Sequence, residues 1–429
     1  MSLSAGVWWS GGTYVEGAFG RLPLEIVDLI HSFCTRDLSA ALRLVCKRFN
    51  EGHRWRRCRV RVSVGDAQVS ELSRVLCGPA LTRLSFAGCR NVSGDALARV
   101  LAGTNRLTRL DLSGMVVPRE LVWQLATLVP HLRDLIAVFL QPVDRQPWQL
   151  RDFCQLQSLT ALEKLDLPQW RDISFLSAGF TALRAIACRS MPALDDSPET
   201  RAVLPGLTQL THISLARSGP VQVDFAQCIR TLRQLEFIDL SFTTVSDAGV
   251  RLLLVQFVAT LTALICNSCR NLLRPFGHVQ SASELPRLER VEFSECDLTA
   301  GHWMVLAQLT SLRRINASSC QLGNFRVAEF RALTQLTHLS LAGNKLSDEV
   351  LWSGLTRLTR LEKVNLIDNF FTDAGVGGIA RTWPRVRELN LFGNDELTER
   401  GLFMLCGALM DAKIVPPFHL TAAEPSSRA

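Results

Sequence analysis

Cysteine is the residue type with the widest chemical potential in this sequence, because thiolates act as nucleophiles, redox centres and zinc ligands. The chain of 429 residues contains 13 cysteines and 8 histidines. Cys266 and Cys269 form a CxxC pair, a spacing found in zinc and dithiol sites. A zinc site needs a second CxxC or a histidine pair at a fixed distance, and neither follows in the sequence. We therefore expect this pair to have a structural role.

Other residue patterns that support catalysis are missing. The sequence contains no GxxxxGK[ST] phosphate loop, no HExxH and no GxSxG. The neighbouring carboxylates Asp195 and Asp196 lie in a proline-rich stretch, and the histidines are dispersed. These residues do not assemble a nucleophile, a base and an oxyanion site. We therefore expect no enzyme, no cofactor and no metal site.

An internal repeat explains where the cysteines lie. Apolar residues recur at offsets 0, 3 and 5 from an anchor, and a special residue follows at offset 8. Adjacent anchors are 21 to 30 residues apart, so each repeat forms one coil that can bury its apolar face only against the next coil. Offsets 3 and 5 place two side chains on the same face of a short strand. The thirteen anchors are Leu81, Leu107, Leu132, Leu162, Leu183, Leu210, Leu235, Leu261, Leu288, Leu312, Leu336, Leu361 and Val386.

Offset 8 marks the bend that ends each predicted strand. A buried Asn there satisfies backbone groups that the bend leaves open, and a Cys fills the same narrow space. The repeat predicts an α/β solenoid over residues 81–410, a curved horseshoe with a parallel concave sheet and convex helices. Ser246, Thr372 and Thr398 are the expected caps of such helices. The residues at offset 8 include Cys89, Cys269, Cys296, Cys320, Asn344, Asn369 and Asn394.

The middle repeats are less regular. The repeat from Leu132 to Leu162 contains Pro142, Pro147 and Trp148, so we expect loops to bulge from the scaffold there, where recognition often occurs. Four tryptophans fall where the convex helices should pack, and we expect them in the core rather than on the surface. They are Trp123, Trp303, Trp352 and Trp383.

Offsets 2, 4 and 6 are expected to face the concave groove. Offset 2 is mostly basic, and offset 4 is often acidic or small. Two such rows can simply pair across strands. Alternatively, the groove binds a peptide of mixed charge, with Arg for carboxylate or phosphate and apolar side chains as anchors. The candidate binding residues are Arg83, Arg109, Asp111, Lys164, Asp166, His212, Phe237, Asp239, Arg290, Glu292, Arg314, His338, Lys363 and Phe392, with Ile265 and Ile367 as further apolar anchors.

The segment before the repeats predicts a different structure. Residues 21–55 form a helical hairpin in this interpretation, because Pro23 suits a first helical turn and Asp37 suits the cap of a second helix. Residues 1–20 are expected to be flexible. Residues 56–80 are expected to form an atypical capping repeat, since residues 59–64 alternate as in a strand.

This N-terminal segment resembles an F-box. The marks of that family appear in order as Leu22-Pro23-x-Glu25-Ile26, Asp37-Leu38, Val45-Cys46-Lys47-Arg48-Phe49 and a later Trp55. Phe49 replaces the tryptophan that is commoner in that run. The repeats resemble the cysteine-containing class of leucine-rich repeats. The whole chain is therefore similar to the F-box/leucine-rich-repeat family.

The resemblance implies a role in protein binding. In that family the F-box docks on a Skp-family adaptor of an SCF-type cullin-RING ubiquitin ligase, and the repeats hold a protein substrate. Two alternatives remain: the hairpin only caps the end of the solenoid, or the chain is a scaffold in a cytoskeletal or organellar assembly without ubiquitin chemistry. Carried over, the residues that face the adaptor or form the hairpin core are Leu22, Pro23, Ile26, Ile30, Leu38, Val45 and Cys46.

Net charge, hydrophobicity and cysteine content bear on nucleic-acid binding, membrane insertion and cellular compartment. The net charge is +7, but the sequence has no long Lys/Arg run, so nucleic-acid binding through the arginine rows ranks behind the two protein-binding interpretations. The most apolar stretch, residues 252–266, is too short and polar for a membrane span. An odd number of cysteines without a signal peptide predicts that the protein lies in the cytoplasm or nucleus.

Residues 411–429 are expected to be a C-terminal tail.

Overall fold

The computed structural model describes residues 57–59, 66, 69, 81–167, 173–177, 179–188, 202–218, 226, 229–279, 284–410 and 412–417. The predicted helical hairpin at residues 21–55, with all seven of its candidate adaptor residues, lies outside these ranges.

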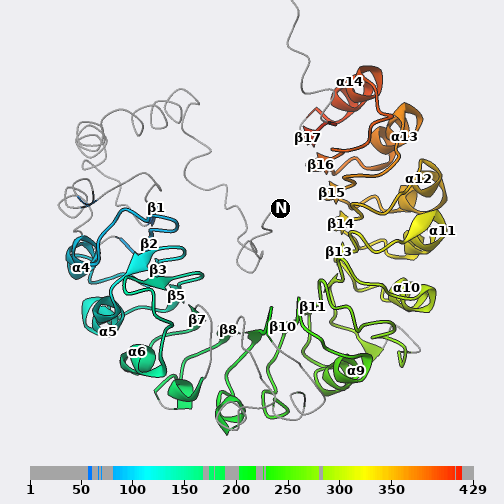
Figure 1. Cartoon of the computed structure of the whole chain (residues 1–429). Coiled ribbons are helices and arrows are strands. Elements are labelled where there is room, and N and C mark those ends of the chain that lie inside the picture. Colours follow the sequence, from blue (N-terminus) through cyan, green and yellow to red (C-terminus); the bar gives the residue numbers. More distant parts are fainter. Residues whose placement is uncertain are drawn as a thin grey trace, which may run out of the picture.

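A parallel sheet lines the inner side of a horseshoe (Figure 1). Fifteen strands of the described residues follow one another in chain order, apart from β4 and β6, which form a separate small sheet. Each of the thirteen predicted anchors is followed two residues later by one of these strands. The strands are β1 Arg57–Arg59, β2 Arg83–Ser85, β3 Arg109–Asp111, β4 Val116–Val117, β5 Asp134–Ile136, β6 Gln141–Pro142, β7 Lys164–Leu167, β8 Ala185–Cys188, β9 His212–Ser214, β10 Phe237–Asp239, β11 Ala263–Ile265, β12 Arg290–Glu292, β13 Arg314–Asn316, β14 His338–Ser340, β15 Lys363–Asn365, β16 Glu388–Asn390 and β17 Lys413–Val415.

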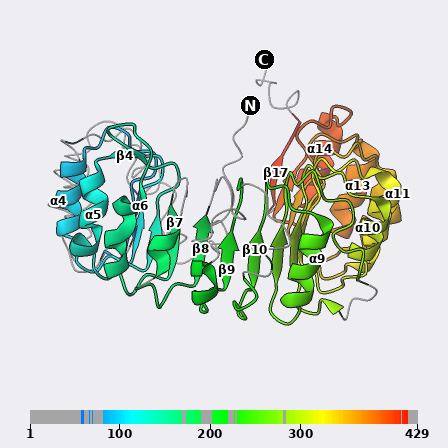
Figure 2. The same ribbon diagram turned by 60° about the horizontal axis from the view of Figure 1, so that its bottom comes forward.

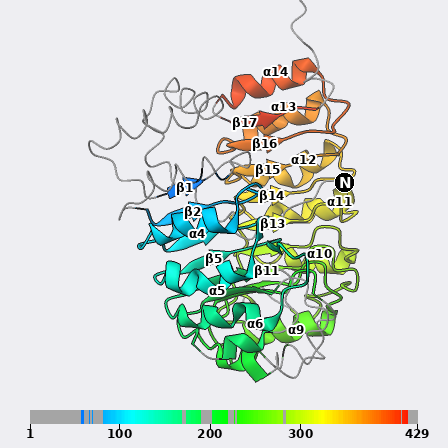
Figure 3. The same ribbon diagram turned by 60° about the vertical axis from the view of Figure 1, so that its left-hand side comes forward.

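Helices cover the outer, convex side of the sheet (Figures 1 and 2). Figure 3 shows how the helices of the N-terminal arm stack side by side, one per coil. The α-helices are α4 Gly94–Ala102, α5 Arg119–Leu128, α6 Leu150–Phe153, α9 Asp247–Gln256, α10 Ala300–Leu306, α11 Gly323–Ala328, α12 Glu349–Ser353, α13 Asp373–Thr382 and α14 Glu399–Ala408. Short 3-10 helices are η1 Cys154–Ser158, η2 Ser174–Ser177, η3 Leu204–Gly206, η5 Glu329–Ala332 and η6 Leu355–Arg357.

The core is a continuous apolar layer between the sheet and the helices. The central residue of each strand points into it: Leu84 pairs with Leu110 on the next strand, and both are buried. Leu339 and Leu389 occupy the same place in the C-terminal arm. Each fully buried leucine contributes about 1.5–3 kcal/mol, so the apolar residues of the repeat stabilise the packing of one coil on the next.

The residues at offset 8 link one coil to the next, as the sequence predicts. Asn344 is buried, and its Nδ2 donates a hydrogen bond to the carbonyl of Ala317 in the preceding coil at 2.7 Å. Its Oδ1 accepts from the backbone N–H of Cys320 at 3.0 Å. Cys320 in turn donates from Sγ to the carbonyl of Phe293 at 2.9 Å. Cys and Asn at offset 8 therefore have the same structural role, because both form hydrogen bonds with backbone groups at the bend.

The predicted helix caps are also confirmed. Ser246, Thr372 and Thr398 each accept a hydrogen bond from a backbone N–H in the first turn of α9, α13 and α14. The coils are joined here as well, because Asp373 accepts from the backbone N–H of Thr398 at 2.8 Å. A Cβ on Gly401 would lie 2.2 Å from the Asp373 carboxylate. Glycine at this position therefore lets the carboxylate reach the cap of the next helix.

Several details differ from the sequence-based expectations. The sheet continues to β17, beyond the boundary predicted at residue 410. At the other end, β1 pairs with β2 at residues 57–59, slightly before the alternating stretch that predicts a strand. Trp303 and Trp383 are buried, but Trp123 and Trp352 are exposed, so the prediction of a core position is wrong for these two.

Candidate binding face on the concave sheet

Most of the predicted binding residues lie on the two arms of the concave sheet. In these arms, side chains alternate between the exposed concave face and the buried core, as the burial pattern of β13 shows. Exposed or half-buried candidates on β2, β3, β7, β9 and β12 to β15, and directly after β16, are Arg83, Arg109, Asp111, Lys164, His212, Arg290, Glu292, Arg314, His338, Lys363 and Phe392.

The remaining candidates, on β7 and β10, are buried rather than exposed in the groove. Asp166, Asp239 and Phe237 are 0%, 2% and 9% exposed, which corrects the expectation of an open surface at these positions. Phe237 is covered in part by the His212 ring, which stacks on it at 5.4 Å, and by the Arg290 guanidinium at 5.9 Å. With Ala263 and Ile265, Phe237 forms a small apolar cluster separate from the main core.

The polar row at offset 4 has a backbone function. Asp239 accepts a hydrogen bond at Oδ1 from the N–H of Ser241, two residues later, at 2.7 Å. Asp111, Asn316, Asn365 and Asn390 accept the corresponding bond in their own coils. Short polar side chains at this position therefore stabilise the turn that ends each strand. The preference for Asp, Asn and Ser in the sequence was the signal for this role.

The charged row at offset 2 pairs only in places. Arg109 lies 3.7 Å from Asp134 on the next strand, and Lys363 lies 2.6 Å from Glu388 on the next strand. Asp134 and Glu388 were not among the predicted residues, although they occupy the same offset. Burial raises the pKa of Asp134, and the nearby Lys164 and Arg109 counteract this effect. Charge pairing across strands thus accounts for part of the row.

The two histidines of the row are not cations at neutral pH. Burial lowers the pKa of His212. Burial, together with the neighbouring Arg314 and Lys363, lowers the pKa of His338 to about 4. The positive charge of the C-terminal arm therefore comes from arginine and lysine, and His338 is a neutral side chain between them.

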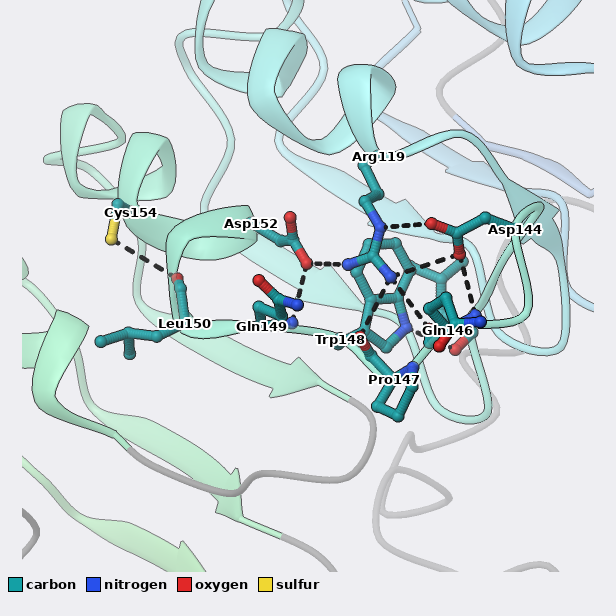
Figure 4. Close-up of polar contacts among 10 residues, drawn as sticks. Arg119, Asp144, Gln146, Pro147, Trp148, Gln149, Leu150, Asp152 and Cys154 are labelled. Atoms are coloured by element: carbon teal, nitrogen blue, oxygen red, sulfur yellow. Dashed lines mark hydrogen bonds and ion pairs between the residues drawn. The ribbon is translucent and has the colours of Figure 1, made fainter.

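The proline-containing loop of the long repeat packs against the scaffold around one arginine (Figure 4). Arg119, at the start of α5, forms ion pairs with Asp144 and the fully buried Asp152. Its guanidinium also donates to the carbonyl of Gln146 at 2.9 Å and lies over the ring of Trp148. The bonds from Arg119 raise its own pKa and lower the pKa of Asp144. Sequence reasoning expected a bulging loop here and missed this cluster.

The CxxC pair is buried in the core, which confirms the structural interpretation of these residues. Cys266 and Cys269 are 0% exposed, and the Cys269 Sγ donates to the carbonyl of Leu240 at 3.1 Å. Burial raises the pKa of the Cys266 thiol, whereas the hydrogen bond with Cys266 lowers the pKa of Cys269. In a neighbouring coil, burial raises the pKa of Cys320 to about 11, so that thiol is protonated at neutral pH and is a poor nucleophile. Among the described residues, no three His, Cys, Asp or Glu side chains are grouped closely enough to hold a metal ion.

The length and composition of the helices bear on whether a segment could cross a membrane. Within the described ranges, none of the helices combines the length and apolar character that crossing a bilayer requires.

Comparison with known proteins agrees with this architecture. A family model described as Leucine Rich repeat matches residues 332–349. One chain of the crystal structure of the Rad7 and Elc1 complex in yeast is similar over 88% of this chain and 94% of its own length, with 16% identity and a TM-score of 0.53. An internalin (inlF) from Listeria monocytogenes str. 4b F2365 shares 20% identity at a TM-score of 0.46, covering 89% and 94% of the two chains. None of the curated proteins matches the sequence. The chain is a leucine-rich-repeat solenoid of the α/β class.

Proposed function

We propose that this solenoid is a protein-interaction scaffold that acts as the substrate-recognition subunit of an SCF-type cullin-RING ubiquitin ligase. In this proposal, residues 21–55 dock on a Skp-family adaptor, and the concave face holds the protein substrate in the cytoplasm or nucleus. The chain itself then supplies binding rather than catalysis. The observation that carries the proposal is the continuous concave sheet with charged side chains exposed or half-buried along both arms and the exposed Phe392 near its C-terminal end.

The coil-to-coil bonds make this face suited to binding. The hydrogen bonds of Asn344 and Cys320 fix the bends at the strand ends, so the face is held in place before a partner arrives. Preorganisation lowers the entropy cost of association, and curved repeat arrays commonly present such a concave surface to their partners. The solved chain of similar fold was crystallised in a complex of Rad7 and Elc1, which is consistent with a binding role.

The adaptor part of the proposal is tested with the purified full-length chain and a purified Skp-family adaptor. We expect a 1:1 complex in size-exclusion chromatography. Ile26→Asp, which places a charge on the predicted apolar helix face, should abolish the complex, and Asp28→Asn on the same predicted helix should preserve it. A folded wild-type chain that leaves the adaptor unbound would refute the ligase role. Recovery within a large assembly that lacks the adaptor would favour the alternative scaffold function.

A further inference from the structure

Four side chains that are basic by residue type share one register on the concave face. Arg290, Arg314, His338 and Lys363 are successive Cα partners across β12, β13, β14 and β15. Neighbouring strands are about 4.8 Å apart, so each of these side chains lies directly beside the next. Like charges in directly opposite positions destabilise a sheet. The row therefore lowers stability unless acidic groups compensate it.

Compensation is present at the two ends of the row. Arg290 lies 2.5 Å from Glu292, and Lys363 lies 2.6 Å from Glu388. In the part of the chain that the structure describes, no carboxylate lies within ion-pair distance of the exposed Arg314. Its sequence neighbour Arg313 does have such a partner, Glu289, at 3.6 Å. Among the described residues, Arg314 is therefore the cation of this row that has no carboxylate within ion-pair distance.

His338 lies beside Arg314 and responds to the charges around it. Arg314 from β13 and Lys363 from β15 disfavour its protonation, while Glu362 before β15 and Glu388 from β16 favour it. Its Nδ1 lies 2.9 Å from the Thr337 hydroxyl, within hydrogen-bond distance. An anion bound at Arg314 would add a favourable charge, so the ring would accept a proton more readily.

We propose that Arg314, flanked by Arg290 and His338, binds an acidic segment of the protein that the concave face recognises, through an Asp or Glu carboxylate. This inference rests on the proposed protein-binding function and names the chemistry of the partner. The planar guanidinium pairs with a carboxylate through two parallel hydrogen bonds. A carboxylate at this place also reduces the repulsion between Arg314 and Arg290, its direct neighbour on β12, so binding lowers a cost that the free protein carries.

The test measures binding of a fluorescein-labelled hexaglutamate peptide to the full-length chain by anisotropy at low ionic strength. Arg314→Gln should weaken binding about fivefold or more, a typical loss for a charge-assisted pair. Arg313→Gln, which removes the same charge one residue away, should change it by less than about twofold. Circular dichroism of both variants checks that the fold is intact.

A second readout follows the imidazole of His338 by NMR. Hexaglutamate should raise the pKa of His338, and binding should correspondingly strengthen as the pH falls from 7 towards 5, because the coupling is reciprocal. Equal weakening by both arginine substitutions, no binding by the wild-type chain, or an unmoved His338 pKa would each overturn the proposal. Adaptor capture by the same variants reports on residues 21–55 separately, so failure here is distinguishable from failure of the ligase role.

Discussion

The side-chain amide of Asn369 donates a hydrogen bond to the backbone carbonyl of Leu341, in the preceding coil, at 3.0 Å. Its Oδ1 accepts from the backbone N–H groups of Asn344 and Leu346 at 3.3 and 2.9 Å. The same amide also donates to the carbonyls of Leu366 and Ile367 in its own coil, so one buried side chain satisfies backbone groups of two adjacent bends. This contact explains why a polar residue recurs inside an otherwise apolar layer.

Asn369→Ala should lower the free energy of unfolding by about 2–4 kcal/mol, because several buried backbone groups lose their partner together. Asn365→Ala is the matched control in the same coil, since Asn365 accepts one turn bond from Ile367 on the half-buried concave face. It should cost about 1 kcal/mol or less. Urea denaturation measures both values, and equal losses would argue against the coil-linking role.

His302 should make stability depend on pH. The side chain is 1% exposed among Phe276, Phe293 and Trp303, and neither ring nitrogen has a hydrogen-bond partner among the described residues. Burial lowers its pKa from 6.5 to about 3. Between these pKa values His302 is protonated in the unfolded chain and neutral in the folded chain. The free energy of unfolding therefore falls as the pH drops from 6.5 towards 3.

Because of this histidine, the free energy of unfolding of the wild-type chain should be about 2 kcal/mol lower at pH 5 than at pH 7. His302→Phe should remove that loss, and His131→Phe at an exposed position should keep it. Thermal or urea unfolding at the two pH values gives the comparison. An unchanged pH dependence in His302→Phe would contradict the assignment.

Arg119→Leu should destabilise the loop of the long repeat. Removing the arginine leaves the buried carboxylate of Asp152 without its counter-charge, a loss of about 3–5 kcal/mol in buried pairs. Hydrogen exchange should accelerate over residues 141–152. Arg133→Leu is the control, because Arg133 pairs with Glu163 on the exposed surface and should cost less than about 1 kcal/mol. Unaltered exchange in the loop would show that Arg119 does not hold it.

Phe139 occupies a backbone position that favours glycine. Its φ is 55°, and the equivalent residues seven positions after other anchors include Gly88, Gly114, Gly343 and Gly393, all with positive φ. The ring is 63% exposed, so Phe139→Gly loses little packing and relieves strain of about 1–2 kcal/mol.

We expect Phe139→Gly to be neutral or to stabilise the chain by up to about 1 kcal/mol. Phe392→Gly replaces an exposed phenylalanine whose φ is not positive and should destabilise by about 1 kcal/mol. Differential scanning calorimetry distinguishes them, and a clear loss in Phe139→Gly would contradict the strain argument.

The periodic part of the fold was predictable because the spacing of apolar residues directly reflects packing between coils. Leu84 and Leu110 align on neighbouring strands as the anchors predict, and Asn344 links coils as its position predicts. The last strand, β17, was missed because position 411, where its anchor would stand, is Asp rather than an apolar residue.

The candidate site was predictable only in part, because it depends on contacts between distant residues. Burial of Phe237 follows from the placement of His212 and Arg290 around it, which the alternation within one strand does not contain. The Arg119 cluster joins residues 25 and 33 positions apart through a loop of irregular shape. Trp352 is exposed with its ring against Gly378 of the next helix, a contact between coils that the spacing within one coil does not contain. The N-terminal hairpin stays a prediction.

The most direct measurement of the proposed role is affinity purification with quantitative mass spectrometry, comparing the intact chain with a version that lacks residues 1–55. The proposal predicts that a Skp-family adaptor and a cullin accompany the intact chain and are lost from the shortened one, while a partner of the repeats remains with both. Absence of the adaptor from the intact chain, with the repeat partner still bound, would contradict it.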